Sequence, residues 1–229
     1  MRARWLVAPI VVAGCAAAPA SLSGRAAGAY EALQRSLATY GSNPGVREWA
    51  LTLAGEIAAR RGHYAAAEQH FQDALALDPR DAYLKGAYAD FFLDRSRPRE
   101  VLQLLREDSK NDALLLRLAL AERQLPDQRD SYVSHRHDLA ARFDAARRRG
   151  DSLHRREEAR FRLTIENDAD TALALARENW SVQREPTDLR ILIDAARATR
   201  NADALKVASD WVVATHLEDA ATLAALNAR

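Results

Sequence analysis

The stretch that decides the fold runs from Glu48 to Asp81 and reads EWALTLAGEIAARRGHYAAAEQHFQDALALDPRD. In its second half Ala67, Phe71 and Ala74 recur at spacings of four and three, which puts them on one face of a helix. Pro79 ends that helix, because proline cannot continue the backbone hydrogen-bond ladder. An apolar first half and the turn residue Gly62 precede it. The pattern predicts two helices joined by a short turn.

This stretch resembles a tetratricopeptide repeat (TPR), a helix–turn–helix motif of about 34 residues. Gly55 stands at the small position of the first helix, where the two helices of the motif cross closely, and Gly62 and Tyr64 make the turn. The first helix departs from the family, which usually has Trp, Leu and Tyr at three positions where this chain has smaller apolar residues: Leu51, Ala54 and Ala58. The resemblance implies that residues 48–81 form one repeat of a larger array.

The same register extends to both sides of this repeat. Thirty-four residues earlier, apolar residues stand in the equivalent positions: Tyr30, Leu33, Leu37 and Tyr40. In the following segment, 82–108, the register is kept by Ala89, Phe92, Val101 and Leu105. We therefore expect a helix before the matched repeat and a helix pair after it.

Later segments are looser in sequence but still helical in pattern. We expect helices at 111–124, 131–149, 152–166, 169–181, 187–199 and 202–215, and a terminal helix at 217–227 that covers the last pair. The expected fold is all-α: a right-handed solenoid of about five TPR-like antiparallel helix pairs plus a terminal helix. We expect one domain over residues 21–229, with its least regular part at 125–151.

Composition and charge agree with a helical protein that does not bind nucleic acid. Ala and Leu, the strongest apolar helix formers, supply most of the apolar content. The 33 Lys and Arg residues nearly balance the 32 Asp and Glu residues. A general nucleic-acid binder needs a strongly cationic surface.

Residues 1–20 are typical of an export signal. A short cationic start is followed by an apolar run and then by small residues. The run is shorter than the roughly 20 residues that a spanning helix needs. Two cleavage sites compete: Val12 to Cys15 resembles a bacterial lipobox, in which Cys15 is lipidated, whereas Ala18 to Ala20 resembles an ordinary small-x-small site. Both predict a location in the bacterial envelope, either anchored by lipid or free in the periplasm.

No enzyme motif is evident, and we expect neither catalysis nor a cofactor or metal. The sequence contains no glycine-rich phosphate loop, nucleophile elbow or HExxH signature. The spacing of the six histidines does not support a metal site. His135 and His137 are two residues apart and so point away from each other on a helix. His63 and His70 have no evident third ligand, and His154 and His216 are isolated. A locally basic stretch from His135 to Arg156 is interpreted as a solvated helical face, or alternatively as a patch for an acidic partner or lipid.

We expect a scaffold that binds another protein. In TPR proteins the first helices of successive pairs line a groove that binds peptides. The resemblance assigns its inward positions to two groups, the first being Trp49, Thr52, Leu53, Glu56 and Arg60, and the second Tyr83, Gly86, Ala87, Asp90 and Asp94. Trp49 is the expected anchor, or alternatively packs under the helix that carries Tyr30.

A second hypothesis makes the chain an accessory subunit of a membrane transport or export system. Such a subunit would deliver cargo or a metal ion to a membrane protein. The export signal and three histidines in or beside the basic stretch suggest it: His135, His137 and His154.

Overall fold

The computed structural model describes residues 26–40, 43–151 and 155–227, and these residues are all-helical. They contain twelve α-helices, one short 3₁₀ turn (η1, Pro126–Gln128) and no strand. The all-α prediction is therefore confirmed. Within the described residues no helix is both long and apolar enough to cross a membrane. The predicted signal segment, residues 1–20 with Cys15, lies outside the described residues.

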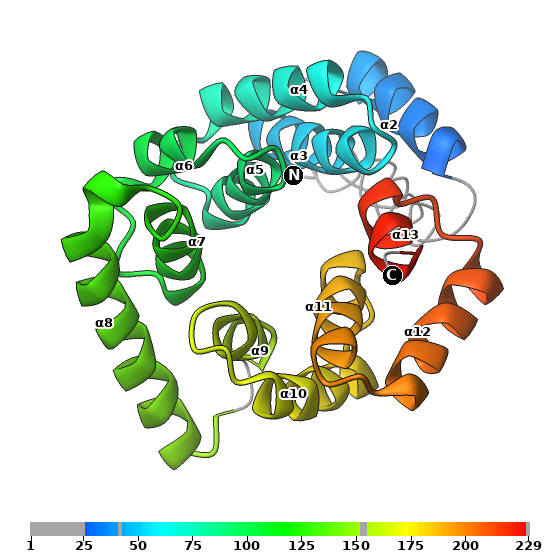
Figure 1. Ribbon diagram of the computed structural model, residues 1–229. Helices are drawn as coiled ribbons and strands as arrows, with labels where there is room; N and C mark the ends of the chain where they lie inside the picture. The colour runs from blue at the N-terminus through cyan, green and yellow to red at the C-terminus, as the bar shows by residue number, and fades with distance from the viewer. Residues whose placement is uncertain (1–25, 41–42, 152–154, 228–229) are drawn as a thin grey trace, which may run out of the picture. The chain divides into compact units, whose positions relative to one another are not determined.

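The helices follow one another with short turns (Figure 1). Their bounds are α2 Ala26–Tyr40, α3 Pro44–Arg60, α4 Tyr64–Leu77, α5 Ala82–Asp94, α6 Pro98–Leu105, α7 Asp112–Glu122, α8 Arg129–Arg148, α9 Arg155–Thr164, α10 Ala169–Val182, α11 Pro186–Ala198, α12 Ala202–Thr215 and α13 Ala220–Asn227. Every helix expected from the sequence is present, with ends that differ by a few residues.

Contacts group the chain into two compact units. Unit 1 comprises Met1–Tyr88 and Trp211–Leu223, and unit 2 comprises Ala89–Asp210 and Ala224–Arg229. The sequence analysis expected the segment after α12 to cover the last helix pair. The grouping divides this segment: Trp211–Leu223, with the buried side chains Leu217 and Thr222, belongs to unit 1, and Ala224–Arg229 belongs to unit 2.

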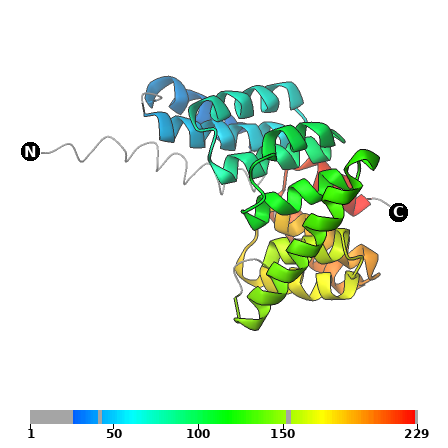
Figure 2. The ribbon, with the colours of Figure 1, turned by 90° about the vertical axis from the view of Figure 1, so that its left-hand side faces the viewer.

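Helices α3 and α4 of unit 1 form the hairpin predicted from residues 48–81, and they lie side by side in Figures 1 and 2. Gly62 makes the turn with a φ of 78°, in the left-handed region that suits glycine. A Cβ atom at Gly55 would lie only 2.9 Å from the ring of Phe71, so the close helix crossing requires glycine. Ala67 and Ala74 are fully buried beside Phe71, and the predicted apolar face of α4 is confirmed.

Helix α2 packs on α3 through small and aliphatic side chains. These side chains form one apolar cluster, made of Ala26, Ala29 and Leu33 from α2 and Ala50, Leu53 and Ile57 from α3. The hydroxyl of Tyr30 lies 2.7 Å from Nε2 of His70 on α4. Helix α2 is therefore attached to both helices of the hairpin.

In unit 2, α7 packs against α6 and α8, and α10 packs against α9 and α11. The long helix α8 buries Leu139, Phe143 and Ala146, as its apolar spacing predicted. Asn111 caps α7 by accepting hydrogen bonds from the backbone amides of Ala113 and Leu114. The expected irregular region consists of η1, this unusually long helix and the turn that follows it.

Candidate partner-binding surfaces

The predicted groove residues of α3 divide into buried and accessible side chains. Trp49 is 38% exposed, whereas Thr52 and Leu53 are 1% and 9% exposed. The Thr52 hydroxyl donates to the backbone carbonyl and to the carboxylate of Glu48, and Leu53 belongs to the apolar cluster with α2. Thr52 and Leu53 thus contribute to the interior of unit 1, and Trp49 to its surface.

Arg60 ends α3 in a half-buried position. Its Nε and Nη2 atoms are buried and have no hydrogen-bond partner within the described ranges. A buried guanidinium nitrogen without a partner costs free energy, because the water that it loses is not replaced. Arg60 is the groove candidate with unused hydrogen-bonding capacity.

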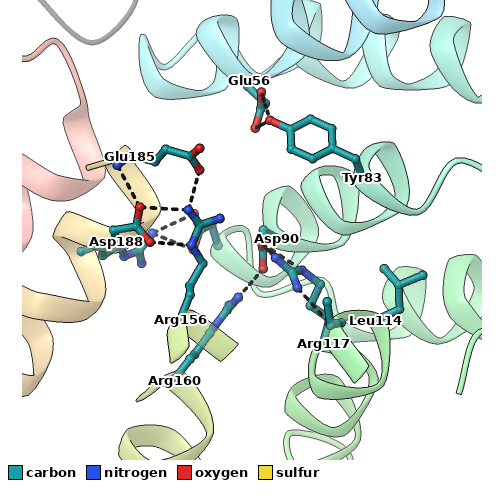
Figure 3. Close-up of polar contacts among 12 residues, drawn as sticks. Glu56, Tyr83, Asp90, Leu114, Arg117, Arg156, Arg160, Glu185 and Asp188 are labelled. Carbon is teal, nitrogen blue, oxygen red and sulfur yellow. Dashed lines mark hydrogen bonds and ion pairs between the residues drawn. The ribbon is translucent and has the colours of Figure 1, made fainter. Parts of the chain in front are cut away.

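Tyr83 of α5 contacts Glu56 of α3 (Figure 3). The Tyr83 hydroxyl donates to both carboxylate oxygens of Glu56, at 3.1 and 3.0 Å. Tyr83 is 59% exposed, the largest exposure of any aromatic residue among the exposed apolar side chains described. On the same helix, the predicted groove positions Gly86 and Ala87 are buried and half-buried. The structure therefore brings two of the predicted groove residues into direct contact.

Asp90, on the next part of α5, lies between two arginines of unit 2 (Figure 3). Arg117 of α7 donates to Asp90 Oδ2 from Nε at 3.0 Å and from Nη2 at 2.6 Å. Arg160 of α9 donates to Oδ1 from Nη1 at 2.6 Å. Burial of Asp90 raises its pKa, but the two guanidinium groups outweigh burial and hold the pKa below its ordinary value. Asp90 is therefore a carboxylate at neutral pH.

The two contacts made from α5 share one spacing. Glu56 and Tyr83 are 27 residues apart, and so are Asp90 and Arg117. Asp90 follows Glu56 by 34 residues, and Arg117 follows Tyr83 by the same number. The same pair of positions is thus in contact in two successive segments, once as a hydrogen bond and once as an ion pair.

Asp94, the last predicted groove residue, pairs with a distant arginine of α11. Arg190 Nη1 donates to both oxygens of Asp94, at 2.9 and 2.8 Å. Burial raises the pKa of Asp94 above its ordinary value, although Arg190 opposes this effect. Asp194, one turn after Arg190 on α11, also has a raised pKa because of burial, with Arg190 lowering it and Asp94 raising it. These three charged groups therefore influence one another electrostatically.

Arg156 of α9 binds two carboxylates at the start of α11. Its Nε and Nη2 donate to Asp188 at 2.5 and 2.9 Å, and Nη2 also donates to Glu185 at 2.6 Å. Asp188 in turn accepts from the backbone amide of Glu185 and from the side-chain amide of Asn179. Asp188 is only 2% exposed, so its charge is buried in a fully paired network, which stabilises the network only while every partner is present.

Sequence reasoning missed four arginines that form these contacts: Arg117, Arg156, Arg160 and Arg190. Three of them were not singled out at all, and Arg156 was placed at the end of a solvated basic face. The repeat register contained a signal for Arg117, since it lies 34 residues after Tyr83. Nothing in the sequence indicates the partners of Arg160 and Arg190, which lie 70 and 96 residues away.

The basic stretch from His135 to Arg156 is only partly a free face. Arg142 donates to Asp112 and to the backbone carbonyl of Ser109, which ties α8 to the start of α7. Arg148 and Arg149 are exposed. The stretch therefore combines side chains that join helices with a short exposed basic segment.

The described part of the chain contains no group of three or more His, Cys, Asp or Glu side chains that could hold a metal ion. His135 Nδ1 lies 2.9 Å from the buried carboxylate of Glu122, whose pKa is raised by burial. His137, His63 and His216 are exposed. His154 lies outside the described residues.

Comparisons with protein-family models, with curated proteins and with solved structures find no match to this chain.

Proposed function

We propose that this chain is a non-catalytic scaffold of the TPR type that binds a protein or peptide partner in the bacterial envelope. In this proposal the helix pairs form a right-handed solenoid, and the odd-numbered helices present the binding face. The partner is recognised mainly on α3 and the first part of α5, both in unit 1. No cofactor or nucleic acid takes part.

The observation that carries this proposal is the contact repeated at a spacing of 34 residues. Glu56 with Tyr83 and Asp90 with Arg117 occupy equivalent positions in successive segments. Repeat proteins stack similar units in a similar geometry, so equivalent residues make equivalent contacts. The close crossing at Gly55 and the turn at Gly62 support the same reading of residues 48–81.

The chemistry of the proposed surface suits an amphipathic partner segment. Trp49 and Tyr83 occupy equivalent positions 34 residues apart and are 38% and 59% exposed. Large, rigid aromatic side chains supply much of the free energy of protein interfaces. The Glu56 carboxylate, held by Tyr83, and the half-buried Arg60 add polar groups of both charges to the same pair of helices.

The location in the envelope rests on the sequence of residues 1–20. In this proposal Cys15 becomes the lipidated first residue of the mature chain and anchors the scaffold to a membrane. Cleavage after Ala20 would instead release a soluble periplasmic protein. Mass spectrometry of the mature amino terminus separates the two outcomes, and a Cys15→Ser variant should lose membrane association only if the lipidation proposal holds.

The binding proposal is tested by partner capture from solubilised envelopes, followed by a measured affinity for the captured protein. We expect Trp49→Ala combined with Tyr83→Ala to weaken the affinity at least about tenfold, as loss of interface anchors does. The helical circular-dichroism spectrum should stay unchanged, because both side chains lie at the surface.

The matched control is Tyr64→Ala on α4. Tyr64 is 38% exposed, the same fraction as Trp49, but it lies on the other helix of the hairpin. Its replacement should leave the affinity unchanged. Equal weakening by both variants, or full affinity in the Trp49 and Tyr83 variant, would rule out the proposed surface.

A further inference from the structure

Two ion pairs in unit 2 join helices that are far apart in sequence. Asp94 of α5 is paired with Arg190 of α11, 96 residues later, and Asp90 of α5 with Arg160 of α9, 70 residues later. In a stack of repeats each unit mainly contacts its neighbours. Helix α5 is nevertheless joined by ion pairs to α9 and α11.

The two pairs differ in their access to water. The side chains of Asp94 and Arg190 are 45% and 39% exposed, whereas those of Asp90 and Arg160 are 25% and 19% exposed. Exposed ion pairs contribute little stability and are screened by salt. The Asp94–Arg190 pair is therefore the weaker connection and the first to separate.

Arg190 also has a second carboxylate within reach of its own helix. Asp194 follows it by four residues on α11, a spacing at which opposite charges on a helix attract one another. Asp194 makes no hydrogen bond within the described part of the chain, and the charges that act on it are those of Arg190, Arg197, Arg160 and Asp94. Asp194 thus offers Arg190 a second carboxylate on its own helix when the pair with Asp94 separates.

We infer that Arg190 is a salt-sensitive latch between α5 and α11. In the closed state its guanidinium binds Asp94 and holds the two helices together. In the open state it turns to Asp194, and α5 separates from α11. Closing also occupies the Asp94 carboxylate, one of the residues expected to face a partner. The latch goes beyond the proposed scaffold function and does not depend on any partner.

The test measures the distance between α5 and α11 by electron spin resonance on the full chain. Spin labels are attached at Ser96→Cys and Ala198→Cys, two exposed positions, in a Cys15→Ser background that removes the native thiol. We expect a narrow distance distribution at about 0.02 M salt and a longer, broader one at about 1 M, where the screening length has fallen to roughly 3 Å.

Three variants separate the latch from general salt effects. Asp94→Asn and Arg190→Gln should give the broad distribution at every salt concentration. Asp194→Asn removes the alternative carboxylate, so its distribution should stay narrow to higher salt than that of the parent. Asp138→Asn on α8 changes the charge equally at an exposed residue and should follow the parent curve.

Two results would overturn the inference. One is an unchanged distribution in Asp94→Asn and Arg190→Gln, which would mean that the pair does not hold the helices together. The other is an Asp194→Asn variant that opens as Asp94→Asn does, which would mean that Asp194 does not compete for Arg190. Far-UV circular dichroism at each salt concentration confirms that every variant compared is folded.

Discussion

Asp90 illustrates how one short side chain organises several helices. Its two carboxylate oxygens accept from different arginines, Arg117 on α7 and Arg160 on α9. Arg117 also donates to the backbone carbonyl of Ala113, so its guanidinium is held in place from a second side. Charge-assisted hydrogen bonds of this kind are the stronger ones in proteins. Asp90 therefore contributes to the packing of unit 2 as well as to its surface chemistry.

We predict that Asp90→Asn lowers the free energy of unfolding by about 2 kcal/mol at pH 7, the usual size of a hydrogen-bonded contact to a charged group. The amide keeps the shape of the side chain but removes the negative charge that Arg117 and Arg160 bind. Urea unfolding followed by circular dichroism measures the change. The control is Asp210→Asn, whose exposed ion pair with Lys206 should cost less than about 1 kcal/mol.

The Asp90 contribution should depend on pH in a defined direction. Its pKa is lowered in the folded protein, so the contribution is complete above the ordinary value of 3.8 and is lost as the pH falls through the folded-state pKa. The difference in unfolding free energy between the parent and Asp90→Asn should therefore shrink as the pH falls below about 4. A difference that stays constant over this range would show that the carboxylate charge contributes nothing.

At the scale of elements, the α3–α4 hairpin depends on the absence of one side chain. Phe71 is 1% exposed and stacks on Tyr88 with 5.1 Å between the ring centroids, so its ring has little space to move. Gly55 lets α3 approach this ring closely. Glycine lowers the intrinsic stability of a helix, and here the close packing of two helices offsets that cost.

Gly55→Ala should destabilise the protein by about 1 kcal/mol, because an overpacking cost of about 1–3 kcal/mol exceeds a helix-propensity gain of about 1 kcal/mol. Gly28→Ala on α2 is the matched control. A Cβ atom there meets nothing within 4 Å, so this change should raise stability by as much as about 1 kcal/mol. Urea midpoints measured side by side decide the matter, and a stabilising Gly55→Ala would refute the close-crossing argument.

The helices themselves were predictable, because their signals are local. Apolar residues at spacings of three and four, a cap such as Asn111 and breakers such as Gly62 and Pro79 act within a few residues. The divided roles along α3 were not predictable. Thr52 and Leu53 lie on the same helix as Trp49 but are buried. Leu53 packs in the apolar cluster with α2, and the Thr52 hydroxyl donates to Glu48.

At the scale of the whole chain, the segment Trp211–Leu223 is grouped with the first 88 residues rather than with the helices that precede it. Leu217 is 4% exposed and Val212 is 8% exposed, so this segment brings apolar surface to unit 1. The stability of the amino-terminal helices is thereby linked to residues near the other end of the chain.

We predict that Leu217→Ala lowers amide hydrogen-exchange protection in α3 and α4 but not in α9 and α10. Leu173→Ala is the complementary variant, because Leu173 is 7% exposed and belongs to α10 in unit 2. It should lower protection in α9 and α10 only. Each change should cost about 3 kcal/mol within its unit, as expected for a buried leucine. Equal loss of protection in all four helices after either change would mean that the two units unfold together.

The sequence alone determined that the chain is helical, where its helices lie and which residues make the α3–α4 crossing, because these depend on contacts between near neighbours. The tertiary structure decided which expected groove residues remain accessible, which arginines pair with Asp90, Asp94 and Asp188, and which unit contains Leu217. Those outcomes depend on residues 27 to more than 100 positions apart, and the path of the backbone brings them together. The repeat register indicates one of these contacts, that of Asp90 with Arg117, and no local pattern in the sequence indicates the others.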